Sequence, residues 1–365
     1  MLMLEQKGNM ALVRQRKSPG RRFMDTSILN TLSRIAPDLM DEMELRALIL
    51  ERVAVLEPIG RRALAARLHV AEREVRAAAD ALKRAGCLTQ SASGMELTEQ
   101  GKNLVEAARV ISGGRRALAT MELALARKLN VERVCVVRGD SDIDSSVMTE
   151  VARAAARQIR YLLQDAHVLA VTGGRTIALT GEALEVAAPL DITVVPAQGG
   201  MGEGVNTQAN TQAERFAQRL GGYHRLLHLP DGLSGAAANE LASLPQVREA
   251  LELMRHADVV FYGIGRAMDV AKRRGLSVAE REALEREGAV AEALGFYFDA
   301  QGRVVGQGAS LAFRPEDIGH RNRAAAVAAG RAKAEAIVAV CAHHPHRLLV
   351  TDEGAALRMM QLLRM

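Results

Sequence analysis

The chain has 365 residues, of which 48% are hydrophobic and 25% are charged, and it contains three cysteines. This length exceeds one ordinary hydrophobic core, so we expect two domains, and the apolar fraction excludes a disordered chain. The longest apolar runs are only strand-sized, which excludes a membrane-spanning helix. Because no secretory signal pattern is present, we expect a cytoplasmic protein.

The cysteines and histidines give no metal signature. The three cysteines lack CxxC spacing, which argues against a zinc site and against a disulfide framework. His343, His344 and His346 lie close together, but no cysteine or acidic residue lies at ligand spacing, and Pro345 interrupts them. We interpret this cluster as a solvated turn, and we predict neither a metal nor a cofactor.

The positive charge is concentrated in the first third of the chain. Residues 1–115 hold 19 Lys and Arg against 14 Asp and Glu, a net charge of +5, and the whole chain also carries +5. The remaining residues are therefore neutral overall. This asymmetry points to a polyanionic partner for the N-terminal part.

Helical and strand patterns follow one another in that basic third. Apolar residues recur at three- and four-residue steps from Glu44 to Leu56, and Pro58 and Gly60 then break the helix. The elements that we predict are helices over 44–56, 61–68 and 72–84, then short strands over 87–90 and 95–98 joined by residues 91–94. Two helices around a short turn, followed by a hairpin, predict a winged helix-turn-helix.

The last of these helices would read DNA. Val75, Ala79 and Leu82 would face the core, which leaves the basic residues on other faces, able to reach phosphates and base edges in a major groove. The candidate DNA-binding residues are Arg61, Arg62, Arg73, Arg76 and Lys83. An ordinary solvated helix face is the alternative, and the hairpin and the charge asymmetry favour DNA binding over it.

Two further segments flank the winged helix. Residues 25–39 precede it, and residues 104–125 follow it with apolar residues at helical spacing; either could be a linker helix that packs on a second subunit. Gly113 and Gly114 are the predicted hinge. We predict a DNA-binding domain over 1–112 and an effector and oligomerisation domain over 115–365.

The remaining two thirds of the chain alternate short β-branched runs with amphipathic helices. This pattern predicts an α/β fold, a Rossmann-like doubly wound and mostly parallel sheet. The predicted strands cover 133–137, 168–172, 191–196, 223–228, 259–264, 324–328 and 348–351. Ligands of such sheets bind at the carboxyl ends of the strands.

Glycine-bearing loops follow three of those strands, at 172–176, 196–200 and 263–265. Glycine lets the backbone approach a ligand, and free N–H groups at a helix start can hold an anion, so loops that converge would form a phosphate site. A dinucleotide fingerprint at 263–265 is disfavoured because Met268 occupies the place of its third glycine. The basic run 272–274 is either a solvated face or a phosphate clamp.

The sequence resembles the sugar-binding transcriptional regulators of the SorC type, most closely the branch that regulates central glycolytic genes and senses fructose-1,6-bisphosphate. The resemblance spans nearly the whole chain. It is carried by Glu57-Pro58-Ile59-Gly60-Arg61-Arg62, Gly139-Asp140-Ser141-Asp142, Val171-Thr172-Gly173-Gly174, Val195-Pro196-Ala197, Gln208-Ala209-Asn210-Thr211, Lys333-Ala334-Glu335-Ala336-Ile337 and Val350-Thr351-Asp352-Glu353-Gly354-Ala355-Ala356.

This resemblance implies an effector domain that is related in fold to phosphosugar isomerases, lacks their catalysis and serves a tetrameric repressor. By the same resemblance, Thr176 and Lys333 would hold one phosphate, whereas Gln208, Arg273 and Glu292 would hold the other phosphate and the sugar hydroxyls. The complete set of candidate effector-binding residues is Gly173, Gly174, Arg175, Thr176, Gln198, Gly199, Gln208, Gly263, Gly265, Arg273, Glu292 and Lys333.

Two positions depart from the family pattern. Arg175 stands where the family has threonine, and Gln198 stands where it has arginine. If both loops face one pocket, Arg175 could replace the lost charge from the opposite side. Alternatively, the effector has changed to a monophosphate such as glucose 6-phosphate, fructose 6-phosphate or a triose phosphate.

We therefore expect a homo-oligomeric regulator, a dimer or tetramer, whose partners are operator DNA and a sugar-phosphate effector. A phosphosugar isomerase-like enzyme is the first rival, but no carboxylate and histidine set with a clear general-base role follows the strands, where Asp352 and Glu353 form the acidic pair. A DNA-binding protein whose α/β domain serves only for dimerisation is the second rival.

Overall fold

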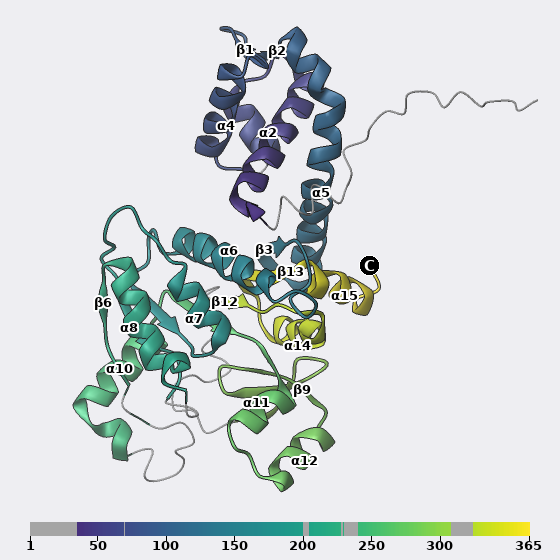
Figure 1. The fold of residues 1–365 in the computed structure, drawn as a ribbon. Helices are drawn as coiled ribbons and strands as arrows, with labels where there is room; N and C mark the ends of the chain where they lie inside the picture. The colour runs from purple at the N-terminus through teal and green to yellow at the C-terminus, as the bar shows by residue number, and fades with distance from the viewer. Residues whose placement is uncertain (1–34, 69, 200–203, 228, 230–239, 308–323) are drawn as a thin grey trace, which may run out of the picture. The chain divides into compact units, whose positions relative to one another are not determined.

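The computed structural model describes residues 35–68, 70–199, 204–227, 229, 240–307 and 324–365 (Figure 1). The chain divides into two compact units, Met1–Gly113 and Gly114–Met365. A single helix, α5 (Glu99–Leu129), runs through Gly113 and Gly114, so the glycine pair does not interrupt the helix. A hinge at this pair stays a prediction. Across the described residues, no helix combines the length and apolarity that crossing a bilayer requires.

The first unit is the predicted winged helix. Its elements before α5 are α2 (Pro37–Leu56), α3 (Arg61–Leu68), α4 (Glu72–Arg84), β1 (Leu88–Gln90) and β2 (Met95–Leu97). The apolar faces of these elements meet in one core, in which Ile49, Leu64 and Val75 are fully buried. The predicted core face of α4 is confirmed, since Ala79 and Leu82 are buried beside Val75.

Helix α2 differs from the prediction at its N-terminal end. It begins at Pro37 rather than at Glu44, because proline fits the first turn of a helix, where its missing N–H would have no partner anyway. Residues 37–39 therefore belong to α2. Of the remaining residues of the predicted flanking helix, 25–34 lie outside the described residues.

The wing is tied back to the segment that ends α2. Strands β1 and β2 pair antiparallel, and the Ser91 amide donates to the Gly94 carbonyl at 2.9 Å across the turn. The Leu97 amide on β2 donates to a carboxylate oxygen of Glu57 at 2.6 Å, and Ile59 forms a bridge with Met95. The predicted helix break therefore also anchors the hairpin.

The second unit is built on a seven-stranded sheet in which every pairing is parallel. The strand order is β3-β13-β12-β7-β4-β5-β6. Each strand lies at a predicted position: β3 (Val131–Val137), β4 (Val168–Val171), β5 (Thr193–Pro196), β6 (Tyr223–His224), β7 (Val259–Gly263), β12 (Ala324–Val327) and β13 (His346–Asp352).

Helices cover both faces of this sheet, which confirms the doubly wound fold (Figure 1). One face packs against α6 (Ser146–Leu162), α7 (Arg175–Glu182) and α8 (Ala209–Leu220). The other face packs against α10 (Pro245–Arg255), α14 (Ala334–His343), α15 (Glu353–Leu362) and the end of α5. Neighbouring residues on one strand point to opposite cores, as Phe261 and Tyr262 do on β7.

The strand order reverses between β4 and β7. From β4 the chain builds outward through β5 and β6, and it then returns to the other side of β4 with β7 and continues to β12 and β13. The crossovers at such a reversal leave in opposite directions, and a crevice opens at the carboxyl ends of the two strands. The loop at 172–174 follows β4, and the loop at 263–265 begins at the end of β7.

The sequence analysis does not predict a second, antiparallel sheet of four strands in the order β11-β10-β9-β8. Its elements, with the helices between them, are β8 (Gly265–Arg266), α11 (Ala267–Arg273), α12 (Val278–Arg286), β9 (Ala289–Ala293), β10 (Phe296–Asp299) and β11 (Val304–Gln307). The internal strand β10 is buried at all four positions, so it lacks the alternation of exposed and buried residues that predicts a strand.

The interpretation of the histidine cluster as a solvated turn is wrong. His344 and His346 are buried, and the Tyr262 hydroxyl on β7 lies 3.1 Å from His344 Nε2 and 2.5 Å from His346 Nε2. His346 Nδ1 must donate to the His344 carbonyl, 2.9 Å away, so its Nε2 accepts from the tyrosine. These hydrogen bonds offset the free-energy cost of burying two imidazoles.

Candidate functional site

The glycine loop after β4 is packed closely against the start of α8. A Cβ atom at Gly173 would lie 2.3 Å from the Thr207 carbonyl oxygen, so only glycine fits there. The Gly174 amide donates to the same carbonyl at 2.9 Å, and Gly174 has a φ of +113°, which favours glycine. These contacts place the predicted residue Gln208 beside the loop.

Helix α7 begins at this loop with two predicted effector residues. Arg175 is exposed and makes no ion pair with another described residue. Thr176 is buried, and its hydroxyl contacts the Met148 sulfur at 3.6 Å. The loop therefore offers a guanidinium and the amides of a helix start on the same side of the sheet as the strand ends.

The loop after β7 leads from the parallel sheet into the antiparallel one. The Gly263 amide donates to the Thr172 hydroxyl at 3.4 Å, which joins this loop to the one after β4. A Cβ atom at Gly265 would lie 2.4 Å from a Val270 methyl group and 3.7 Å from a terminal nitrogen of Arg273. The same glycine pairs with Glu292 on β9, so three predicted residues lie together.

The third loop follows β5, next to β4. The Ala197 amide donates to the Val171 carbonyl at 2.7 Å, which holds the loop against the end of β4. Gln198 is buried, and Gly199 follows it. Gly200, the last residue of this predicted loop, lies outside the described residues.

Glu292 is held by a neighbour that the sequence analysis did not single out. Arg274 Nη2 donates to Glu292 Oε1 at 2.9 Å, and the Gly295 amide donates to the same oxygen at 2.9 Å. The side chains of Arg274 and Glu292 are only 6% and 10% exposed, so this is a desolvated ion pair. Within the basic run 272–274, Arg274 is thus structural, whereas Lys272 and Arg273 are exposed.

Lys333 and Arg273 lie close enough to repel each other. Burial lowers the pKa of Lys333, and the charge of Arg273 lowers it further. The negative charges of Asp142, Asp352 and Asp269 raise the pKa of Lys333 and so partly oppose this effect. Neither cation forms an ion pair within 4 Å with another described residue, so an anion between them would relieve the repulsion.

Acidic residues beside Lys333 were missed as site residues. The Ser141 and Gly330 amides donate to Asp352 Oδ2, and the Ala332 amide donates to an oxygen of Asp142 at 2.8 Å. These bonds fix the loops after β3, β12 and β13 around Lys333. The segment 139–142 was a sequence signal for this cluster, but only the strand order shows that it meets Lys333.

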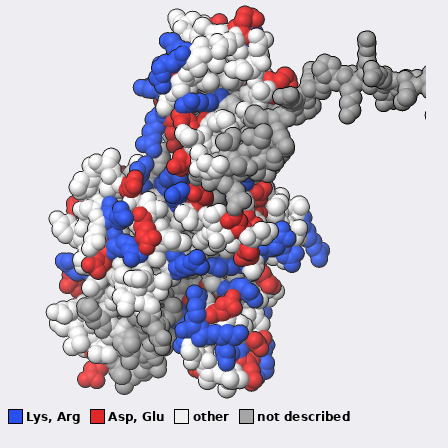
Figure 2. Space-filling view, viewed as in Figure 1, with Lys and Arg blue, Asp and Glu red and all other residues white. Residues whose placement is uncertain are grey.

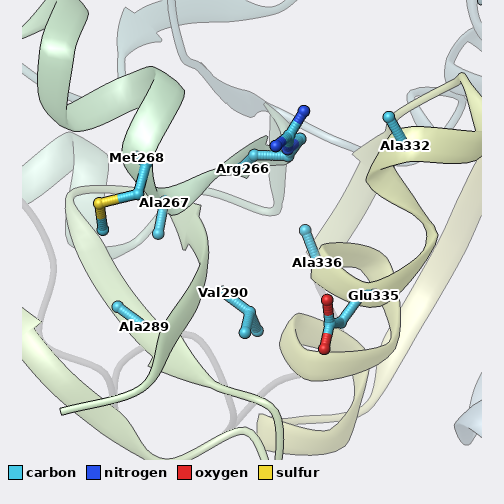
Figure 3. A pocket seen from close by; sticks show the side chains of 8 residues that line it. All are labelled: Arg266, Ala267, Met268, Ala289, Val290, Ala332, Glu335 and Ala336. Atoms are coloured by element: carbon cyan, nitrogen blue, oxygen red, sulfur yellow. The ribbon is translucent and has the colours of Figure 1, made fainter. Parts of the chain in front are cut away.

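A pocket of roughly 190 Å³ lies beside these residues (Figure 3). Arg266 and Glu335 come from its two facing walls, and the rest of the lining is apolar. The pocket is lined by Arg266, Ala267, Met268, Ala289, Val290, Ala332, Glu335 and Ala336. None of the predicted effector residues lines it, although Ala332 directly precedes Lys333.

Four of the predicted DNA-binding residues lie near the N-terminal ends of α3 and α4, whereas Lys83 lies in the last turn of α4. Figure 2 shows basic side chains on the first unit, with acidic side chains nearby. Arg62 and Arg76 both form ion pairs with Glu72, and Arg61 lies 3.8 Å from Asp80. Arg73 and Lys83 are exposed on α4.

Comparison with known families matches both units. The model described as "Putative sugar-binding domain" matches residues 116–361, and the model described as "CggR N-terminal DNA binding domain" matches residues 43–111. The central glycolytic genes regulator of Priestia megaterium is 35% identical over 90% of this chain and 97% of its own length. The chain belongs to this family. It is a sugar-binding transcriptional regulator of the SorC type.

Other members of the family support this assignment. The central glycolytic genes regulator of Bacillus subtilis is 35% identical over 92% of this chain and 98% of its own length. A crystal structure described as a putative SorC family transcriptional regulator from Enterococcus faecalis is 33% identical, with a TM-score of 0.62 over 66% of this chain and 99% of that one. The full-length sorbitol operon regulator SorC from Klebsiella pneumoniae, at 16% identity, shares the fold with a TM-score of 0.61 over 88% of this chain and 99% of that one.

Proposed function

We propose that this regulator binds operator DNA through its first unit, with an affinity that a phosphorylated sugar in its second unit controls. The effector is fructose-1,6-bisphosphate or a related sugar phosphate. The protein acts in the cytoplasm as a homo-oligomeric repressor of glycolytic genes. The relatives described as central glycolytic genes regulators support the choice of target genes.

The observation that carries the effector proposal is the pair of cations Arg273 and Lys333. Burial lowers the pKa of Lys333, and the neighbouring charge of Arg273 lowers it further. Guanidinium and ammonium groups are the charge-assisted donors that phosphate groups prefer. Arg175 and the amides at the start of α7 supply further donors at the neighbouring loop, where Thr176 and Lys333 would hold one phosphate while Arg273 holds the other.

Coupling between the two units needs no covalent step. The effector would hold the loops after β4, β7 and β12 in one arrangement and so favour one quaternary state of the oligomer. A coupling free energy of about 1 to 3 kcal/mol changes operator affinity by about 5- to 150-fold, which is enough for regulation. We expect the effector to lower operator affinity.

The carboxylates at the strand ends argue against the rival enzyme. Asp352 accepts three backbone N–H bonds, from Ser141, Gly330 and Ala355, and Glu353 accepts one from Gly139. Carboxylate oxygens that already accept backbone amide hydrogen bonds are engaged in holding their loops. Both residues of the acidic pair thus support the loops of the sheet.

A thermal-shift screen tests the proposal. Wild-type protein is titrated with fructose-1,6-bisphosphate, glucose 6-phosphate, fructose 6-phosphate and a triose phosphate, and we expect saturable stabilisation by one of them without product formation. The Lys333→Ala variant should lose this stabilisation. Lys272→Ala is the matched control, because Lys272 is an exposed lysine on the same helix as Arg273. This variant should still be stabilised by the sugar phosphate. Turnover of any of these sugars would favour the enzyme instead.

A further inference from the structure

Glu72 is an acidic residue at the position where a DNA-reading helix meets its target. It is the first residue of α4, and residues at the N-terminal end of such a helix contact base edges. Its side chain is 36% exposed, so it belongs to the surface rather than to the core. An anion at this place opposes the approach of DNA phosphates.

The Glu72 carboxylate bridges two of the predicted DNA-binding arginines. Arg76 Nη2 lies 2.9 Å from Glu72 Oε1, one helical turn away, and Arg62 Nε on α3 lies 3.3 Å from Glu72 Oε2. The arginine side chains are 57% and 89% exposed, so DNA can reach both of them. The bond from Arg76 is the main reason why the pKa of Glu72 is lowered, and the carboxylate stays charged at neutral pH.

We propose that Glu72 is a specificity-determining residue, which holds Arg62 and Arg76 away from backbone phosphates and so suppresses binding to DNA other than the operator. The inference rests on the proposed DNA-binding function of the first unit. For either arginine to turn fully toward a phosphate, it must give up its contact with the carboxylate, and the uncompensated anion then faces the DNA. At the operator, a cytosine amino group can donate to Glu72 while Arg76 contacts guanine.

The salt dependence of binding measures this directly. The logarithm of the binding constant falls with the logarithm of salt concentration, with a slope of about −0.9 for each phosphate that the protein neutralises. If Glu72 withholds the two arginines, the Glu72→Gln variant should gain roughly one phosphate contact on non-operator DNA, and its slope should steepen by about 0.9.

The experiment compares full-length wild type, Glu72→Gln and Glu74→Gln on two duplexes, one of random sequence and one enriched by in vitro selection with the wild-type protein. Glu74 is the matched control, because it is an exposed glutamate in the same helical turn and makes no ion pair with another described residue. Both variants remove one negative charge. Only Glu72→Gln also frees the two arginines.

We expect Glu72→Gln to bind the random duplex roughly 3- to 10-fold more tightly at low salt, with the steeper slope. Its preference for the selected duplex should fall by a similar factor. Glu72→Asp, which keeps the charge, should stay closer to wild type. Equal slopes for Glu72→Gln and Glu74→Gln would overturn the role of Glu72 and leave DNA binding intact. If selection with the wild-type protein enriches no duplex, and the wild type does not bind the random duplex either, the proposed function would be overturned as well.

Discussion

Acidification should destabilise the second unit through its buried histidine pair. Burial lowers the pKa of His344 to about 2 and that of His346 to about 4, against about 6.5 in the unfolded chain. A proton on His344 would sit on Nδ1, which has no hydrogen-bond partner in the described structure. A proton on His346 would direct a second donor at the Tyr262 hydroxyl.

The sign and the magnitude follow from proton linkage. Because the folded pKa values lie below the unfolded value, the histidines cost no stability well above pH 6.5, and stability is lost as the pH falls below that value. At pH 5 each ring costs about 2 kcal/mol, so the pair costs about 4 kcal/mol relative to pH 7.5. This is a large part of the stability of an ordinary domain, about 5 to 15 kcal/mol.

Urea denaturation followed by tyrosine fluorescence measures this effect. The chain has four tyrosines and no tryptophan, and all four tyrosines lie in the second unit, so the signal reports on that unit alone. In His344→Gln, the loss of stability between pH 7.5 and pH 5 should shrink by about 2 kcal/mol. His224→Gln is the control, because His224 is exposed, and it should behave as wild type. The same pH dependence in His344→Gln and wild type would refute the reasoning.

Two further predictions concern packing. Gly173→Ala should lower the free energy of unfolding of the second unit by about 1 to 3 kcal/mol, because its Cβ atom would lie 2.3 Å from the Thr207 carbonyl. Gly263→Ala, whose Cβ atom would have no neighbour closer than 3.9 Å, should change it by less than about 0.5 kcal/mol, and a larger loss for Gly263→Ala would contradict this. In the first unit, Ser112→Ala should cost about 1 to 3 kcal/mol, because the buried Ser112 hydroxyl donates to Glu51 at 2.9 Å; amide exchange in α2 that is no faster in the variant would contradict this.

The parallel sheet could be predicted because most of its strands are short apolar runs between helical segments, although the edge strand β6 is exposed. The antiparallel sheet could not, because β10 is buried on both sides and its residues show no alternation. The histidine pair was interpreted wrongly because the sequence does not show which residue it contacts. Its partner Tyr262 lies 82 residues away from His344 in the chain, and only the pairing of β7 and β13 with β12 brings them together.

The candidate site was predictable where its signal is local. Glycines directly after a strand indicate a loop that approaches a ligand, and the loops at Gly173 and Gly263 are indeed joined through Thr172. The acidic residues around Lys333 could not be placed beside it from the sequence, because Asp142 follows β3 and Asp352 ends β13, and these strands lie far apart in the sequence. The pairing of these strands beside β12 decides that Asp142 and Asp352 act on the pKa of Lys333.

The affinity for DNA, measured with and without the sugar phosphate that stabilises the protein, tests the central claim most directly. Wild type and the Arg273→Ala and Lys333→Ala variants would each be titrated onto the same selected duplex. We predict that the effector weakens binding of wild type by about 5- to 150-fold and leaves both variants unchanged, although the variants bind the duplex normally without it. An equal effect on wild type and both variants would contradict the placement of the effector between these two cations.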